Sequence, residues 1–164
     1  MKTINPAGVW GPRGRGFSMG VIQPDGHVIH FTGQVAWDEN EVIVGNGDVA
    51  EQTRQCFRNI ETVLQAVGGT MADIVSITTY FTDRKQLPLI QSVRLEFLQA
   101  DHEPASTSVM VAGLGHEDFL VELAPIAVVP RDRFREPTEL KLIVPAAAQR
   151  KTGTCITPSP NLSP

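Results

Sequence analysis

Few residues of this 164-residue chain are placed to do chemistry, and Glu122 is the most unusual of them. It lies within residues 119–127, a run that is otherwise apolar. A carboxylate is costly to bury unless it is hydrogen-bonded, and a desolvated carboxyl is suited to proton transfer. Spacing alone favours the other interpretation, in which the Glu122 side chain points into solvent. Residues 106–108, all with hydroxyl side chains, carry the same two interpretations, because hydroxyls on a strand can line a site or cover an exposed face.

Other catalytic patterns do not occur. No two histidines stand four residues apart on a helix, and none has cysteines at metal-ligand spacing, so no metal site is predicted. There is no Gly-x-Ser-x-Gly elbow of the α/β-hydrolases. The glycine-rich stretch at 11–16, which includes Arg13 and Arg15, precedes a strand pattern and not a helix, so it lacks the geometry that cradles phosphate. We expect no cofactor.

Two amphipathic helices must position these side chains. Apolar residues recur every three or four positions over residues 49–67 and again over 87–99. Asp48 is the expected N-cap of the first helix, with Glu51 completing a capping box, and Gly68 is the expected stop.

Strand patterns occupy most of the remaining core region, at residues 17–22, 27–35, 73–83, 106–112 and 119–129. The Pro-Asp-Gly turn between the first two predicts a β-hairpin. The order β-β-α-β-α-β-β is typical of an α+β domain with two helices on one face of a mixed sheet. If the opposite face of the sheet is apolar, we expect it to be buried by self-association of the protein.

Both ends of the chain fall outside this pattern. Residues 1–16 are rich in glycine and proline and predict an irregular arm, followed by one domain at 17–130. Residues 131–164 predict a partly flexible extension that could cover a neighbouring subunit or gate a cleft, with one further strand at 140–144.

Composition excludes several classes of protein. With 41% hydrophobic and 20% charged residues the chain is typical of globular proteins, and its net charge of −4 lacks the positive footprint of nucleic-acid binding. No apolar run approaches the ~20 residues of a membrane span, and the N-terminus has no signal-peptide pattern. Two cysteines, Cys56 and Cys155, do not make a disulfide framework. We predict a cytoplasmic protein whose partners are neither membranes nor nucleic acids.

Five short strings occur together in an order and spacing that resemble the Rid (YjgF) family, also named the endoribonuclease L-PSP family. They are FTGQ at 31–34, EQTRQ at 51–55 with Asn59 and Ile60 after it, DIV at 73–75 with Thr78 and Thr79, Pro104 with Ala105, and VELAPIA at 121–127. The resemblance covers about residues 5–130. It implies a chorismate-mutase-like (YjgF-like) fold and a homotrimer with an internal barrel, whose three small-molecule sites lie in clefts between subunits.

The resemblance also implies an activity, the cofactor-independent hydrolysis of reactive enamines and imines to ketoacids and ammonia. By position it assigns the water-handling carboxylate to Glu122. The substrate-binding positions that follow from it are Phe17, which stacks on a ring, together with Thr32, Gln91, Ser106, Thr107 and Ser108.

One departure from the family pattern matters most. Deaminating relatives read Pro-Ala-Arg-Ser where this chain has PAST at 104–107, so Ser106 replaces the arginine that grips the substrate carboxylate. A bidentate guanidinium contact of about 1.5–3 kcal/mol is lost with it. Arg54 and Arg94 are the other candidate cations, but the sequence directs neither to the cleft, and the acidic pair at 117–118 disfavours an anionic ligand. We therefore expect a subgroup lacking the substrate-binding arginine.

Three functions stay open at this level. The first is a hydrolase or deaminase of an enamine, imine or related small nitrogen metabolite without a simple α-carboxylate, distinct from a standard 2-iminoacid deaminase. The second is a non-catalytic, metabolite-binding or regulatory trimer, in which Glu122 only forms hydrogen bonds. The third is an endoribonuclease or translation inhibitor, which the family name alone implies and the acidic chain disfavours.

Overall fold

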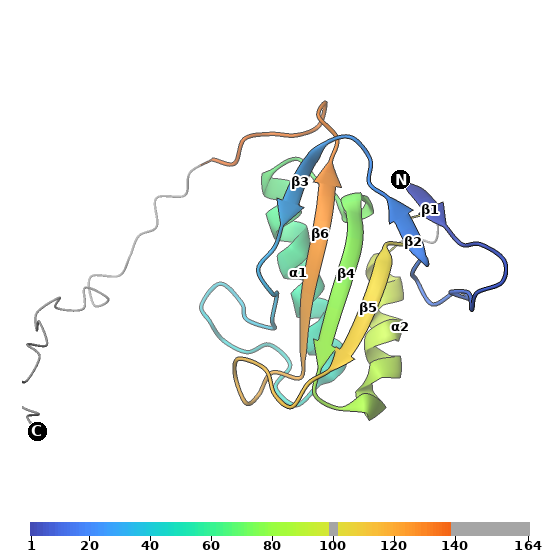
Figure 1. Cartoon of the computed structure of the whole chain (residues 1–164). Coiled ribbons are helices and arrows are strands. Elements are labelled where there is room, and N and C mark those ends of the chain that lie inside the picture. Colours follow the sequence, from blue (N-terminus) through green and yellow to red (C-terminus); the bar gives the residue numbers. More distant parts are fainter. Residues whose placement is uncertain (99–101, 139–164) are drawn as a thin grey trace, which may run out of the picture.

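A computed structural model describes residues 1–98 and 102–138 of the chain. Figure 1 shows a layer of four strands with two helices packed behind it and a small two-stranded ribbon beside one edge. The elements in chain order are β1 (Lys2–Ile4), β2 (Gly20–Ile22), β3 (His27–His30), α1 (Val49–Ala66), η1 (Met71–Asp73), β4 (Ile74–Phe81), η2 (Arg84–Gln86), α2 (Leu87–Phe97), β5 (Ala105–Met110) and β6 (Val121–Val129).

The main sheet has the order β3-β6-β4-β5 and is mixed. Strands β4 and β5 are parallel and are joined through α2, whereas β6 is antiparallel to both β3 and β4. A parallel pair needs a crossover of this kind, which places the connecting helix on a face of the sheet. The predicted α+β class with two helices on one face of a mixed sheet is confirmed.

The core lies between this sheet and the two helices. The apolar stripe of α1, which includes Phe57, Ile60 and Leu64, is fully buried against the strands and α2. Asp48 caps the helix by accepting hydrogen bonds from the backbone N–H groups of Ala50 and Glu51. The predicted capping box does not form at this helix, because the Glu51 carboxylate forms ion pairs with two arginines of α1 instead.

The predicted hairpin between residues 17–22 and 27–35 is wrong. β2 pairs with β1, and β3 pairs with β6, so the two segments belong to different sheets. β3 also ends at His30 rather than Val35. The long apolar strand β6 offers an open edge, and pairing there lets Ile29 pack against the hydrophobic core, which a local hairpin would not achieve.

Both ends of the described chain pack more closely than predicted. The arm expected to be irregular contains β1. After β6, the Phe134 ring stacks on His27, and the Arg133 guanidinium forms an ion pair with the buried carboxylate of Asp73. The strand predicted at 140–144 and the predicted flexible end lie outside the described residues.

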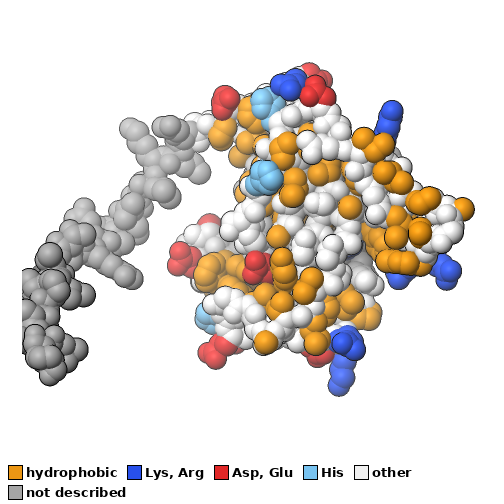
Figure 2. All heavy atoms as spheres, viewed as in Figure 1, with side chains coloured by type: hydrophobic (Ala, Val, Ile, Leu, Met, Phe, Trp, Pro, Cys, Tyr) orange, Lys and Arg blue, Asp and Glu red, His pale blue; other side chains and the backbone are white. Residues whose placement is uncertain are grey.

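The face of the sheet opposite the helices is open. Exposed apolar side chains on it include Val28 on β3 and Val109 on β5. Figure 2, viewed onto this face, shows apolar side chains spread across the strands with polar groups between them, while most charged groups lie towards the rim. Within the described residues, neither helix is long and apolar enough to cross a membrane.

Candidate functional site

Strand register separates the predicted site residues onto two faces of the sheet. Successive side chains of a strand point to opposite faces. Ser106 pairs in register with Ile77, which is buried under the helices, so Ser106 faces the helix side. Glu122 pairs with Tyr80, the neighbour of buried Phe81, and so lies on the open face. β4 also stands between the strands that carry Ser106 and Glu122. One chain therefore cannot bring these two side chains onto one ligand.

Five of the seven predicted site residues share one pocket at the β5 edge. Its volume is about 330 Å³, and it is lined by Phe17, Gln91, Ser106, Thr107 and Ser108, together with Trp10, Arg15 and Arg94. The lining residues come from the N-terminal arm, from α2 and from β5. No carboxylate is among these lining residues.

Arg94, which the sequence did not direct to this cleft, lines the pocket. Its guanidinium donates hydrogen bonds to the hydroxyls of Ser106 (Nη1 to Oγ, 2.7 Å) and Thr79 (Nη2 to Oγ1, 3.2 Å). Arg54, the other candidate, is held on the outside by Glu96 and Glu51. The signal in the sequence was the position of Arg94, four residues after the buried Ile90 on the inner stripe of α2.

The N-terminal arm forms one wall of this pocket and supplies two residues that the sequence reasoning missed. The Cζ atom of Arg15 lies 5.4 Å from the ring centroids of both Trp10 and Phe17. Cation–π contact of this kind is favourable over aromatic faces. Gly16 presses against α2, and a Cβ there would stand 2.7 Å from Leu95 Cδ2 and 3.5 Å from Arg94 Cδ. The arm is thus packed onto the helix that carries Arg94.

Thr32 and Glu122 lie apart from this pocket. Thr32 lines a broader hollow of about 580 Å³ between the segment after β3 and the outer side of α1. Glu122 is half-buried, and its carboxylate touches the backbone of Gly33, where a Cβ would overlap it. Among the described residues, no side chain forms an ion pair with Glu122.

Hydrogen bonds to β6 and to α1 fix the segment that holds Gly33 against Glu122. The backbone of Gln34 exchanges N–H···O bonds of 2.8 and 2.9 Å with Leu123 on β6. The side-chain amide of Asn59 on α1 donates to the carbonyls of Val35 (3.0 Å) and Trp37 (2.9 Å), and accepts from Gln55. These contacts give Gln55 and Asn59, which belong to the EQTRQ string at 51–55 and its continuation, a positioning role.

Gln52, which also belongs to the EQTRQ string, positions the loop that leads into β6. It is fully buried, its amide donates to the Asp118 carbonyl at 2.8 Å, and its carbonyl accepts from the Leu120 N–H at 2.9 Å. Buried polar side chains need such partners. The contact fixes the start of the strand that presents Glu122.

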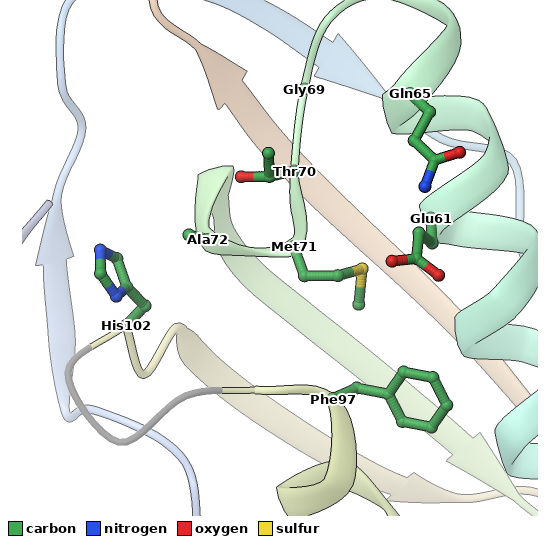
Figure 3. Close-up of a pocket in the computed structure, with 8 residues that line it drawn as sticks. All are labelled: Glu61, Gln65, Gly69, Thr70, Met71, Ala72, Phe97 and His102. Carbon is green, nitrogen blue, oxygen red and sulfur yellow. The ribbon is translucent and has the colours of Figure 1, made fainter.

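A third cavity, of about 420 Å³, lies on the helix side of the molecule (Figure 3). Figure 3 shows Glu61 and Gln65 of α1 on one side, Thr70 and Met71 at the start of the η1 turn, and His102 across from them. None of the predicted site residues lines this cavity. The cavity therefore contributes nothing to the predicted site. In the described part of the chain, no three metal-ligating side chains cluster.

The fold is that of a small α+β domain, and the pocket at the β5 edge is its candidate small-molecule site. The sequence model of the family described as endoribonuclease L-PSP matches residues 14–129, more than half of the chain. The chain belongs to this family, which is the Rid (YjgF) family of the sequence-based prediction.

Similar proteins support this assignment. A RutC family protein from Pyrococcus horikoshii is 30% identical over 102 residues, which are 62% of this chain and 79% of that protein. The solved structure of YyfB, a Rid-family protein from Yersinia pestis, has a TM-score of 0.74 and 32% identity, covering 78% of this chain and 98% of that one. RidA from an Antarctic Psychrobacter bacterium has a TM-score of 0.58 and 26% identity, covering 76% and 94% of the two chains.

Proposed function

We propose that this protein is a cofactor-independent hydrolase of small imines or enamines, with its sites in the clefts between subunits of a homotrimer. The observation that carries the proposal is the separation of Glu122 from the Ser106 pocket. The two groups project from opposite faces of the sheet with β4 between their strands. A second copy of the chain can supply the carboxylate that each pocket lacks.

The chemistry follows from the groups available. Glu122 takes a proton from water as the water oxygen adds to the carbon of the C=N bond, and the nitrogen accepts a proton. The resulting carbinolamine collapses to a carbonyl compound and ammonia, so that one water is consumed for each imine. Phe17 provides an aromatic wall, and the Gln91 amide can hold the polar end of the substrate.

Membership of the family supports the proposed homotrimer as well as the proposed imine hydrolysis. The open face of the sheet carries exposed apolar side chains and few charges near its centre (Figure 2). A face of this composition favours burial against other copies. A trimer would also bring the pocket of one copy near the Glu122 face of the next.

A test by subunit complementation separates this proposal from its alternatives. Imines are generated in the assay from amino acids by an amino-acid oxidase, and ammonia release is followed. Glu122→Gln is expected to lower kcat/KM at least 100-fold, and Ser108→Trp, which fills the pocket, to do the same. Co-expression of the two inactive variants should restore part of the activity, because some interfaces then combine an intact pocket with an intact Glu122. Inactive mixed trimers would exclude a shared site.

The second candidate is a binding protein without catalysis. It is favoured by the absence of any carboxylate among the residues that line the pocket. Wild-type protein that binds a small ligand, leaves it unchanged and releases no ammonia from any imine would support this candidate. Ribonuclease activity, suggested by the family name, predicts cleavage of RNA by highly purified protein. We expect the RNA to stay intact.

A further inference from the structure

Arg94 is a charged side chain at a buried position. The residue is only 4% exposed, and among the described residues its hydrogen-bond partners are the hydroxyls of Ser106 and Thr79. These bonds use two of the five N–H donors of a guanidinium. None of the ion pairs in the described part of the chain includes Arg94.

A buried cation without a counter-ion is unfavourable. Burial lowers the pKa of the Arg94 guanidinium to about 10, so the group is still charged at neutral pH. Hydroxyls can orient a guanidinium but cannot neutralise it. The other titratable group that lines the pocket is Arg15, which is also a cation. The pocket therefore carries positive charge that an anion would balance.

We propose that Arg94 is the anion-binding residue of this pocket and that the pocket takes a small monocarboxylate. One buried positive charge matches one negative charge, and the planar fork of a guanidinium matches a carboxylate. Phe17 and Trp10 provide an apolar wall for the rest of the ligand. The inference rests on the proposed function only in taking this pocket as the substrate site, and it reverses the expectation of a substrate without a carboxylate.

Three neighbours hold Arg94 in place. Ser106 and Thr79 each accept one hydrogen bond from it, and Gly16 allows the N-terminal arm to press on its aliphatic stem. The small side chain of Ser106 leaves the space that the guanidinium from α2 occupies. An arginine at position 106 and Arg94 would compete for this space. Ser106 is thus a positioning residue for Arg94.

The competing occupant is a carboxylate of this protein itself. In a trimer, Glu122 of a second copy could reach Arg94 and form an interface ion pair. In that case removal of Arg94 would weaken the trimer and leave the binding of small carboxylates unchanged, or such binding would not occur at all.

The test uses phenylacetate and its uncharged counterpart phenylacetamide, neither of which is an imine. Dissociation constants are measured by calorimetry on the full-length protein, with trimer content followed by light scattering. Wild-type protein is expected to bind phenylacetate at least tenfold more tightly than phenylacetamide. Arg94→Met, which keeps the volume of the stem, should remove this preference, and Arg94→Lys should keep part of it. Arg54→Met, at a surface arginine paired with Glu96, is the matched control and should change nothing.

Each result of this test either supports or overturns the assignment of Arg94 as the anion-binding residue. No binding of phenylacetate by wild-type protein, equal binding of the two compounds, or unchanged phenylacetate affinity in Arg94→Met would overturn the inference. If binding depends on Arg94 but no imine is hydrolysed, the proposed function fails and the anion site stands. If imines are hydrolysed and the charge preference is absent, the anion site fails and the proposed function stands.

Discussion

The carboxylate of Glu122 rests against the α-carbon of Gly33, so closely that a Cβ at position 33 would lie 2.9 Å from Glu122 Cγ and overlap the carboxylate. Gly33 is held there by the paired backbone of Gln34 and Leu123. Glycine at position 33 therefore leaves free the space that the carboxylate of Glu122 occupies, and Glu122 is the one acidic side chain that the proposed reaction uses.

Gly33→Ala is expected to displace the Glu122 side chain and lower kcat/KM for imine hydrolysis at least tenfold. The clash involves the flexible end of a side chain, so the free energy of unfolding should change by only about 1 kcal/mol. Steady-state kinetics and urea unfolding measure the two effects. Gly115→Ala is the control, since a Cβ there meets nothing within 4 Å. Full activity in Gly33→Ala would show that this contact does not position the carboxylate.

The guanidinium of Arg94 and an arginine at position 106 should be mutually exclusive. Ser106→Arg alone places a second cation at a half-buried position beside the buried Arg94 and is expected to destabilise the fold by about 1–3 kcal/mol. Arg94→Ser combined with Ser106→Arg should relieve this loss and restore the preference for phenylacetate. A double-mutant cycle in urea should give a coupling of about 0.5–3 kcal/mol between the two positions. Additive effects would contradict the shared space.

Asn59→Ala is expected to destabilise the protein by about 1–3 kcal/mol, because the carbonyls of Val35 and Trp37 lose their donor. Urea unfolding measures the change. Thr62→Ala is the control, since the Thr62 hydroxyl donates only to the carbonyl of Arg58 within its own helix. We expect its effect to stay within about 0.5 kcal/mol. Equal effects of both variants would argue against the positioning role of Asn59.

Cys56 should react with thiol reagents only after unfolding. It is fully buried, and burial raises the pKa of its thiol from 9.0 to about 12. At pH 8 the thiolate fraction of the native Cys56 is then about a thousandfold lower than that of a thiol with the pKa of 9.0, and only the thiolate reacts. In a Cys155→Ser background, iodoacetamide labelling detected by mass spectrometry should rise in parallel with urea unfolding. Fast labelling of the native protein would contradict the burial of Cys56.

The open face of the sheet should be the assembly surface. Wild-type protein is expected to be a trimer by light scattering, and Val28→Glu should shift it towards monomers, because the added carboxylate would have to be desolvated in the interface. Leu89→Glu, at a similarly exposed apolar residue on α2, is the control and should leave the trimer intact. If both variants stay trimeric, the subunits meet elsewhere.

Local patterns determined much of the fold. The stripe of α1, its Asp48 cap and the succession of β4, α2 and β5 along the chain follow from interactions within a few residues or from alternating burial, which the sequence displays directly. The hairpin prediction failed because the pairing partner of β3 is the distant strand β6. The local sequence shows the turn that would allow a hairpin, but it does not show that pairing with the edge of a distant strand is more favourable.

The candidate site was likewise predictable from the sequence only in part. Residue types and their order identified Glu122 and the hydroxyls at 106–108 as candidate site residues. Only the tertiary structure decided that Arg94 reaches Ser106 and that Glu122 lies on the opposite face. The reason is geometric. Side-chain direction on one element can be derived from its own periodicity, but the distance between side chains on two elements depends on how helix and sheet pack, which the whole core determines.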